Sequence, residues 1–153
     1  MSGAARGTSF DDFYRSELDR QVRRAYLLTG SAELADDIVH DAMVGMYRRW
    51  SEIDQPAAYL NRAVLNGCRD AGRRAARQRR LIGRISERPG ETAAPDVLDD
   101  VLAGLPFQQR AAVVLRYYES RTTAEIAQVL GCAPGSVGPW IDRALSAMRK
   151  ALA

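Results

Sequence analysis

Cysteine and histidine are scarce in this chain of 153 residues, which contains two cysteines and one histidine. Cys68 and Cys132 lie far apart in the sequence, and neither belongs to a Cys-x-x-Cys pair. Disulfide scaffolds and structural zinc sites need more of these residues at closer spacing, so the sequence argues against both. We expect two small buried thiols, no metal and no cofactor.

Long apolar runs are also missing. The longest uncharged stretch, Ile126 to Ile141, is interrupted by Gly131, Pro134 and Pro139. No window therefore resembles a membrane span, which needs about 20 apolar residues. The stretch from Met1 to Ser9 has no apolar run, so we expect no signal peptide, no membrane insertion and a cytoplasmic location.

Lysine is almost absent, since Lys150 is the only lysine among 22 basic residues. The net charge of +3 is unevenly distributed along the chain. Residues 10–55 carry a net charge of −4, residues 62–88 carry nine arginines against two acids, and residues 89–103 carry four acids and no base. Separate segments with opposite charge suggest separate tasks. Nine arginines in 27 residues favour an anionic partner, because arginine suits phosphate recognition. A solvated basic face is the alternative.

The sequence predicts an all-α fold, because no strand-like alternation of apolar and polar residues is sustained. A first helix is expected from about Phe10 to Thr29, followed by Gly30 as a terminator and Ser31 as the next N-cap. Its apolar positions step by four: Phe10, Tyr14, Leu18, Val22 and Tyr26.

A second helix should run to about Trp50, and a third should start near Ala57, after Pro56, and continue into the arginine-rich segment. The second helix carries two neighbouring apolar stripes, one of Leu34, Ile38, Ala42, Met46 and Trp50 and one of Val39, Met43 and Tyr47. Residues 83–95 contain Pro and Gly without helical periodicity and predict a flexible linker, which a short acidic helix follows.

The C-terminal segment has the spacing of a helix-turn-helix motif. Ala127 lies four residues before Gly131, and Val137 lies six residues after it. A small residue lets two helices cross closely, a glycine makes the turn, and an apolar residue pins the second helix. Thr123, with Glu125 or Gln128 nearby, is the expected cap at the start of the first helix. An ordinary helical hairpin is the alternative.

The second helix of this motif offers few side chains for reading bases. Gly138 and Pro139 carry no donors, and Pro139 lacks the N–H group that would bond to residue 135. We therefore expect this helix to begin late, at Pro139, or to be distorted. Ser136, Trp140 and Arg143 remain as candidate base contacts, and Arg121 is a candidate phosphate contact.

These segments together resemble extracytoplasmic-function sigma factors of the sigma-70 family. The resemblance covers roughly residues 10–150 in the family's order and rests on five stretches: Ala35 to Ala42, Tyr47 to Trp50, Pro56 to Asn66, Leu105 to Glu119 and Glu125 to Leu145. It implies two small helical domains, at residues 1–80 and 99–153, joined by a linker at residues 81–98. It also implies a promoter-specificity subunit without catalytic residues, which binds core RNA polymerase and promoter DNA.

The resemblance also implies the residues that bind each partner. The clamp helices of the polymerase would contact the face containing Asp36, Asp37, Asp41, Met43 and Tyr47. The minus-ten element would contact a loop and the following helix, through Ser51, Glu52, Asn61, Arg62, Asn66, Arg69, Arg73, Arg74 and Arg77. The minus-thirty-five element would contact Arg121, Thr123, Ser136, Trp140 and Arg143. An anti-sigma factor is a further expected partner of the family.

The chain departs from the family pattern at three places. His40 stands where glutamine is usual, Ala133 replaces a capping serine, and residues 138–140 replace a stretch rich in Lys, Ser and Arg. Three other functions remain open: a stand-alone helix-turn-helix regulator, a degenerate sigma-like protein that titrates polymerase, and a small metal-dependent hydrolase. The last depends only on the four-residue spacing of Asp36 and His40.

Overall fold

The computed structural model describes residues 9–82 and 97–153 and divides the chain into two compact units, Met1–Ile85 and Ser86–Ala153. Within the described residues the fold is all α, with seven α-helices and no strand, as predicted. None of the helices in these two ranges is long and apolar enough to cross a bilayer. The predicted linker lies mostly outside the described residues.

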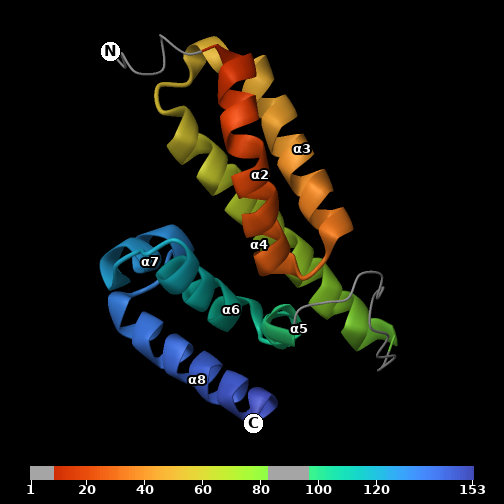
Figure 1. Cartoon of the computed structure of the whole chain (residues 1–153), viewed down its shortest axis with the longest axis vertical. Helices are drawn as coiled ribbons and strands as arrows, with labels where there is room; N and C mark the ends of the chain where they lie inside the picture. Colours follow the sequence, from red (N-terminus) through yellow and green to blue (C-terminus); the bar gives the residue numbers. More distant parts are fainter. Residues whose placement is uncertain (1–8, 83–96) are drawn as a thin grey trace. The chain divides into compact units, whose positions relative to one another are not determined.

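Unit 1 begins with two antiparallel helices, α2 (Phe10–Thr29) and α3 (Ala32–Arg48) (Figure 1). The Ser9 hydroxyl accepts a hydrogen bond from the Asp12 N–H group and caps α2. Gly30 ends the helix in the left-handed conformation at φ 77°, where a residue without a Cβ is favoured. Ser31 then caps α3, so the predicted boundary between these helices is confirmed.

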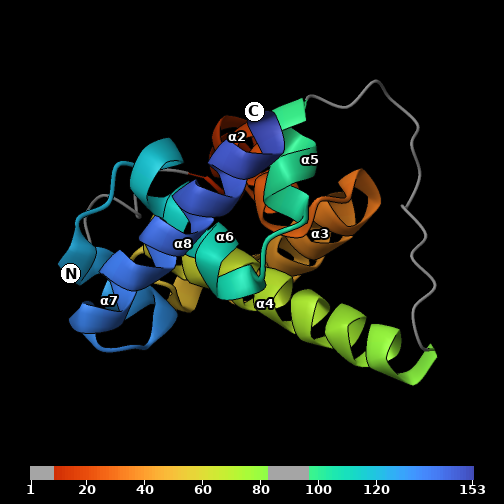
Figure 2. The same ribbon diagram turned by 90° about the horizontal axis from the view of Figure 1, so that it is seen from below.

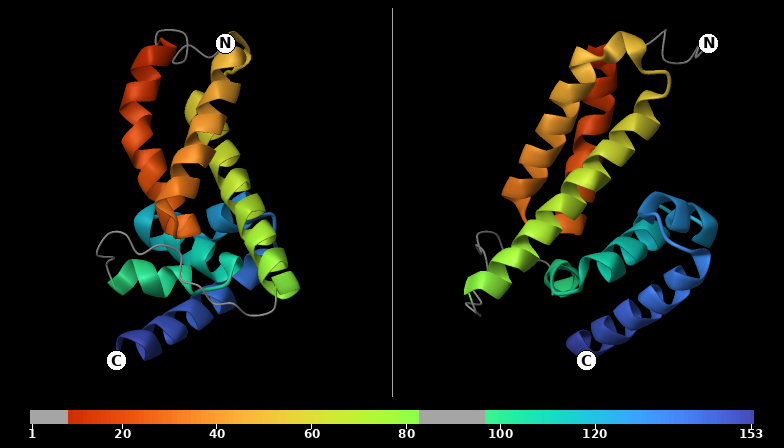
Figure 3. Two further views of the ribbon diagram at one scale, coloured as in Figure 1. Left: turned by 90° about the vertical axis from the view of Figure 1, so that its right-hand side faces the viewer. Right: turned by 180° about the vertical axis from the view of Figure 1, so that it is seen from behind.

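The third helix of unit 1, α4 (Pro56–Ile82), packs on both α2 and α3. Its buried side chains are Leu60, Val64, Leu65, Cys68 and Ala71, and the core of unit 1 also contains Leu28, Val39 and Met46. The C-terminal half of α4 extends beyond the ends of α2 and α3, as Figures 1 to 3 show. The arginine-rich segment therefore lies on a projecting helix, with most of its surface away from its two neighbours.

Unit 2 consists of α5 (Val97–Ala103), α6 (Phe107–Val113), η2 (Val114–Tyr118), α7 (Thr123–Leu130) and α8 (Pro134–Leu152). Helices α5, α6 and α7 all pack on α8 (Figure 3). The core includes Leu115, Ile126, Val137, Ile141 and Ala144. The π-helical turn of η2, which the sequence did not predict, continues α6 and carries Tyr117 and Tyr118 on the surface.

The predicted helix-turn-helix is confirmed between α7 and α8. Gly131 adopts φ 69°, and the Ala127 carbonyl accepts from the N–H groups of both Gly131 and Cys132. Ala127 and Val137 are both buried, as the spacing required. The N-cap is Thr122 and not Thr123, because the Thr122 hydroxyl and the Glu125 side chain bond each other's backbone N–H groups in a capping box.

The prediction that α8 begins at Pro139 is wrong, because the helix begins at Pro134. Proline suits a first helical position, where its missing N–H group costs nothing. Pro139 lies inside the helix and removes one hydrogen bond to Gly135. Gly138 precedes it, and a residue without a Cβ avoids the clash that disfavours the α conformation before proline. The helix therefore continues through this position.

Replacing Gly67 by alanine is expected to destabilise unit 1, because the added Cβ would lie 2.7 Å from Cγ2 of Ile38. The β-branched Ile38 has a stiff χ1 and little freedom to move away. Overpacking costs about 1–3 kcal/mol, against about 1 kcal/mol gained in helix propensity. We expect a lower melting temperature for Gly67→Ala. Gly45→Ala is the matched control, since nothing lies within 4 Å of its added Cβ. Equal melting temperatures for the Gly67→Ala and Gly45→Ala variants would contradict the prediction.

Candidate functional site

The outer face of α3 is acidic and exposed. Five ionisable side chains lie on it: Glu33, Asp36, Asp37, His40 and Asp41. We call the set Asp36, Asp37 and Asp41 the acidic face. Tyr47, at the end of the same helix, is 65% exposed. This surface therefore combines three carboxylates with an accessible aromatic ring, as a docking surface for a basic and apolar partner requires.

Met43 is an exception, because it is only 2% exposed and lies in the core of unit 1. The prediction that Met43 shares the exposed face is therefore wrong. The buried stripe of α3 runs through Ala35, Val39, Met43 and Met46, whose spacing of three and four residues places them on one side of a helix.

A groove of about 590 Å³ separates the outer faces of α2 and α3. From α2, the side chains of Tyr14, Leu18, Val22 and Tyr26 line it, and Asp36 and His40 line it from α3. These α2 side chains belong to the apolar stripe predicted for that helix, and they are only half-buried. Among the described residues, no group of three or more His, Cys, Asp or Glu side chains is placed to hold a metal ion.

Aromatic rings hold the turn that leads from α3 to α4. Trp50 opens the 3-10 turn η1 (Trp50–Glu52) and packs against Phe10 and Phe13, with ring centroids 5.4 and 5.5 Å apart. Phe10 also packs edge-on against Tyr47 at 5.1 Å. Ser51 and Glu52 are exposed beyond this cluster. The first turn of α2 therefore anchors the turn that carries two of the predicted minus-ten contacts.

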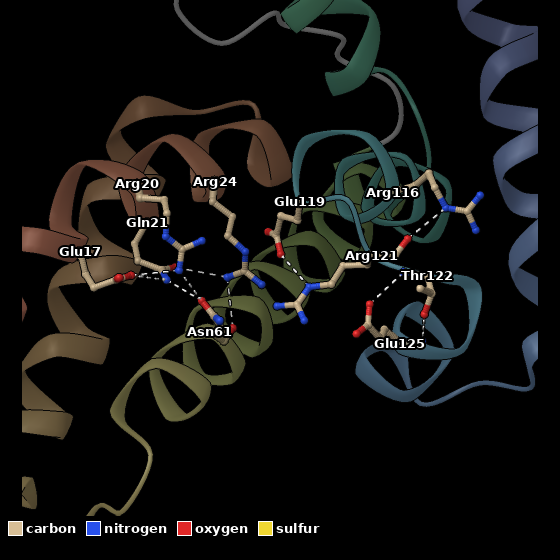
Figure 4. A network of polar contacts seen from close by, with 10 residues as sticks. All are labelled: Glu17, Arg20, Gln21, Arg24, Asn61, Arg116, Glu119, Arg121, Thr122 and Glu125. Carbon is tan, nitrogen blue, oxygen red and sulfur yellow. Dashed lines mark hydrogen bonds and ion pairs between the residues drawn. The ribbon is translucent and has the colours of Figure 1, made fainter. Parts of the chain in front are cut away.

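Asn61 on α4 is engaged by α2 (Figure 4). Its amide oxygen accepts hydrogen bonds from Gln21 Nε2 at 2.6 Å and Arg20 Nη2 at 3.1 Å, and its backbone carbonyl accepts from Arg24 Nη1 at 3.1 Å. Gln21 is fully buried, so this bond satisfies a polar group in the core. In this structure the amide oxygen of Asn61 is therefore engaged in hydrogen bonds that join α4 to α2.

Replacing Asn61 by alanine is expected to lower the free energy of unfolding by about 1–3 kcal/mol, since the buried Gln21 amide keeps only its longer bond to Glu17 and Arg20 also loses a bond. Asn66→Ala is the matched control, because Asn66 is exposed and its removal should change stability by less than about 0.5 kcal/mol. Urea unfolding of both variants tests this. Equal midpoints for Asn61→Ala and the wild-type chain would show that the α2–α4 bond is dispensable.

The exposed side of α4 carries a continuous basic stripe. Arg62, Asn66, Arg69, Arg73 and Arg77 follow one another at spacings of three and four residues, which places them on one side of the helix. We call this set the Arg stripe. Arg69 is half-buried and the other four are exposed, as is Arg74 beside them. Because the spacing extends over four turns, the stripe can follow several phosphates of one strand.

The five residues predicted for minus-thirty-five contacts lie in unit 2 in different environments. Arg121 forms an ion pair with Glu119 at 3.5 Å (Figure 4). The Thr123 hydroxyl accepts a hydrogen bond from Arg116 Nη2 at 2.6 Å. Ser136 and Trp140 are half-buried, and Arg143 is exposed. No sequence pattern pointed to Arg116, which also donates to the Arg121 carbonyl at 3.2 Å and so holds the chain before α7.

Comparison with known proteins matches each unit to a separate family model. The model described as "Sigma-70 region 2" matches residues 13–78, and the model described as "Sigma-70, region 4" matches residues 96–148. An RNA polymerase sigma-E factor of Streptomyces coelicolor is 30% identical over 151 residues, which cover 94% of this chain and 85% of that protein. The ECF RNA polymerase sigma factor SigM of Mycobacterium tuberculosis is also 30% identical over 151 residues, covering 94% and 77%.

Two solved structures share the fold. One is the sigma factor RpoE in complex with the anti-sigma factor NepR from Bartonella quintana, with a TM-score of 0.69, 20% identity and coverage of 92% of this chain and 96% of that one. The other is CnrH in complex with the cytosolic domain of CnrY, with a TM-score of 0.66, 23% identity and coverage of 99% and 94%.

Proposed function

This chain belongs to the extracytoplasmic-function (ECF) group of RNA polymerase sigma factors, and we propose that it binds core RNA polymerase, selects promoters and helps to open them for initiation. The observation that carries the proposal is the division of charge within unit 1. Carboxylates cover the outer side of α3, whereas arginines cover the projecting part of α4. A subunit that joins a basic protein surface to an anionic nucleic acid needs both surfaces on one rigid body.

The acidic face with Tyr47 is the proposed contact for the clamp helices of the polymerase. The carboxylates supply steering and register, and the tyrosine ring supplies an apolar anchor at the end of the patch. Because Met43 is buried, the proposed surface contains Asp36, Asp37, Asp41 and Tyr47 only.

The Arg stripe and the η1 turn are the proposed contacts for the opened minus-ten strand. A separated strand needs cationic support along its backbone, and a base that leaves the stack needs polar groups that match its edge. Arginines of α4 supply the first. Ser51, Glu52 and Asn66 are exposed polar groups that supply the second.

The remaining assignments follow the same proposal. Residues 1–80 form the polymerase and minus-ten domain, residues 81–98 the linker, and residues 99–153 the helix-turn-helix domain. The polymerase performs the chemistry, so the chain itself contributes no catalytic group. The proposed location is the cytoplasm, where the chain would meet the polymerase and the promoter. An anti-sigma factor that covers the acidic face would hold the protein inactive by competing with polymerase.

Run-off transcription tests the proposal. The purified chain is mixed with core RNA polymerase and fragmented genomic DNA, and transcript starts are mapped. We expect discrete starts that share an upstream motif and disappear when the chain is omitted. Tight polymerase binding without any starts would instead favour a titrating protein. DNA binding without polymerase binding would favour an independent helix-turn-helix regulator.

A further inference from the structure

The leading turns of α8 present almost no side chains that can read a base. In a helix-turn-helix protein, the N-terminal part of the second helix faces the base edges in the major groove. Here the exposed positions of that part are Ala133, Pro134, Gly135, Gly138 and Pro139, none of which carries a side-chain donor or acceptor. A base edge is recognised by hydrogen bonds or by contact with a thymine methyl group. The outer surface of these turns can supply few of either.

The glycines in these turns leave open space. A Cβ built on Gly135 or Gly138 meets no atom within 4 Å, so neither glycine is required by packing against the rest of unit 2. Gly135 would accept a longer side chain as it stands, and Gly138 would accept one once Pro139 is also replaced. We call the exposed surface formed by Ala133, Pro134, Gly135, Gly138 and Pro139 the smooth surface. Packing inside unit 2 does not account for the absence of side chains at its two glycines.

The polar groups that remain nearby are poorly suited to specific reading. Ser136 and Trp140 are half-buried, and the next exposed residues are Asp142 and Arg143. The carboxylate of Asp142 opposes close approach to phosphates. We assign the exposed Arg143, and Arg121 beside Glu119, to phosphate contacts, which orient a protein on DNA without specifying its sequence.

We infer that unit 2 binds the upstream promoter duplex through its sugar-phosphate backbone, with little discrimination among bases, so that promoter choice rests on unit 1. This inference rests on the proposed sigma-factor function. The smooth start of α8 allows the helix to enter the groove of many sequences, because no side chain there must find a particular partner. Specificity then comes from the strand held by η1 and α4.

A promoter library with separately randomised minus-thirty-five and minus-ten windows tests this inference. Holoenzyme assembled with the wild-type chain transcribes the library, and the templates that give transcripts are sequenced. We expect base preferences below about twofold at every minus-thirty-five position. At minus-ten we expect preferences above about fivefold, the range typical of a specifically read base pair. A minus-thirty-five preference above about fivefold for the wild-type chain would overturn the inference.

The variant G138K/P139S places donors on the smooth surface and should create a preference above about fivefold at one or more minus-thirty-five positions. P139R serves the same purpose if the first variant does not fold, because it retains Gly138 and removes the internal proline. The control A147K adds the same single positive charge at an exposed position farther along α8 and should raise transcription without a preference. If every folded variant remains without preference, the smooth surface is not the cause and the inference fails. A library that yields no transcripts with any chain would instead refute the proposed function.

Discussion

Reversing two charges of the acidic face, by Asp37→Arg together with Asp41→Arg, is expected to abolish transcription in the run-off assay. Both carboxylates are exposed one turn apart on α3, so their replacement should leave the core of unit 1 intact. Placing two guanidinium groups against a basic clamp surface costs several kcal/mol. A loss of about 3 kcal/mol corresponds to a roughly hundredfold weaker complex with core polymerase.

Binding of the labelled chain to core polymerase, followed by fluorescence anisotropy, measures this loss directly. Asp37→Asn with Asp41→Asn should lose less affinity, because it removes attraction without adding repulsion. Asp11→Arg with Asp12→Arg is the matched control, since it makes the same charge change at exposed positions on α2 and should bind within about threefold of wild type. If the reversal on α3 also binds within about threefold, the polymerase contact lies elsewhere on the chain.

The helix boundaries of unit 1 were predictable because capping is local chemistry. Gly30 and Ser31 separate α2 from α3 as expected, and Pro56 starts α4. In each case the terminating or capping group acts on backbone within four residues, so its effect can be recognised without any knowledge of tertiary structure. The capping box at Thr122 was misplaced by one residue, since neighbouring threonines offer the same hydroxyl.

The faces of the helices were less predictable, because α3 carries two adjacent apolar stripes and α2 buries a side that includes polar residues. On α2 the stripe through Leu18 and Val22 lines the groove, while the fully buried side chains include Gln21, Ala25 and Leu28. The buried Gln21 amide is satisfied by Glu17 and Arg24 on its own helix and, at the shortest distance, by Asn61, 40 residues later. Met43 was assigned to the wrong face for the same reason, because the choice between stripes depends on which helices pack nearby.

The continuity of α8 shows a tertiary effect that outweighs a local rule. The internal Pro139 removes a hydrogen bond worth about 0.5–1.5 kcal/mol, and the local rule therefore favoured a late helix start. However, Val137 and Ile141 on either side of it are buried, and each contributes about 1.5–3 kcal/mol when it leaves water. Packing against α6 and α7 therefore keeps the turn helical.

Removing two charges of the Arg stripe, by Arg73→Gln together with Arg77→Gln, is expected to weaken promoter opening and to reduce its dependence on salt. The two side chains lie one turn apart on α4 and are exposed, so the variant should remain as stable as the wild-type chain. Each phosphate contact to a single strand contributes about 0.7 to the slope of log affinity against log salt concentration. Loss of two contacts should therefore make that slope less steep by about 1.4.

The measurement is the affinity of reconstituted holoenzyme for a minus-ten probe with an exposed single strand, determined at several salt concentrations. Arg15→Gln with Arg23→Gln is the matched control, because it removes two exposed arginines from α2 and should leave the slope unchanged. Arginine on any exposed surface raises net charge, but only arginine that contacts phosphate displaces condensed counterions. A slope that changes equally in both variants would assign the effect to net charge, and an unchanged slope in the α4 variant would place the strand away from the Arg stripe.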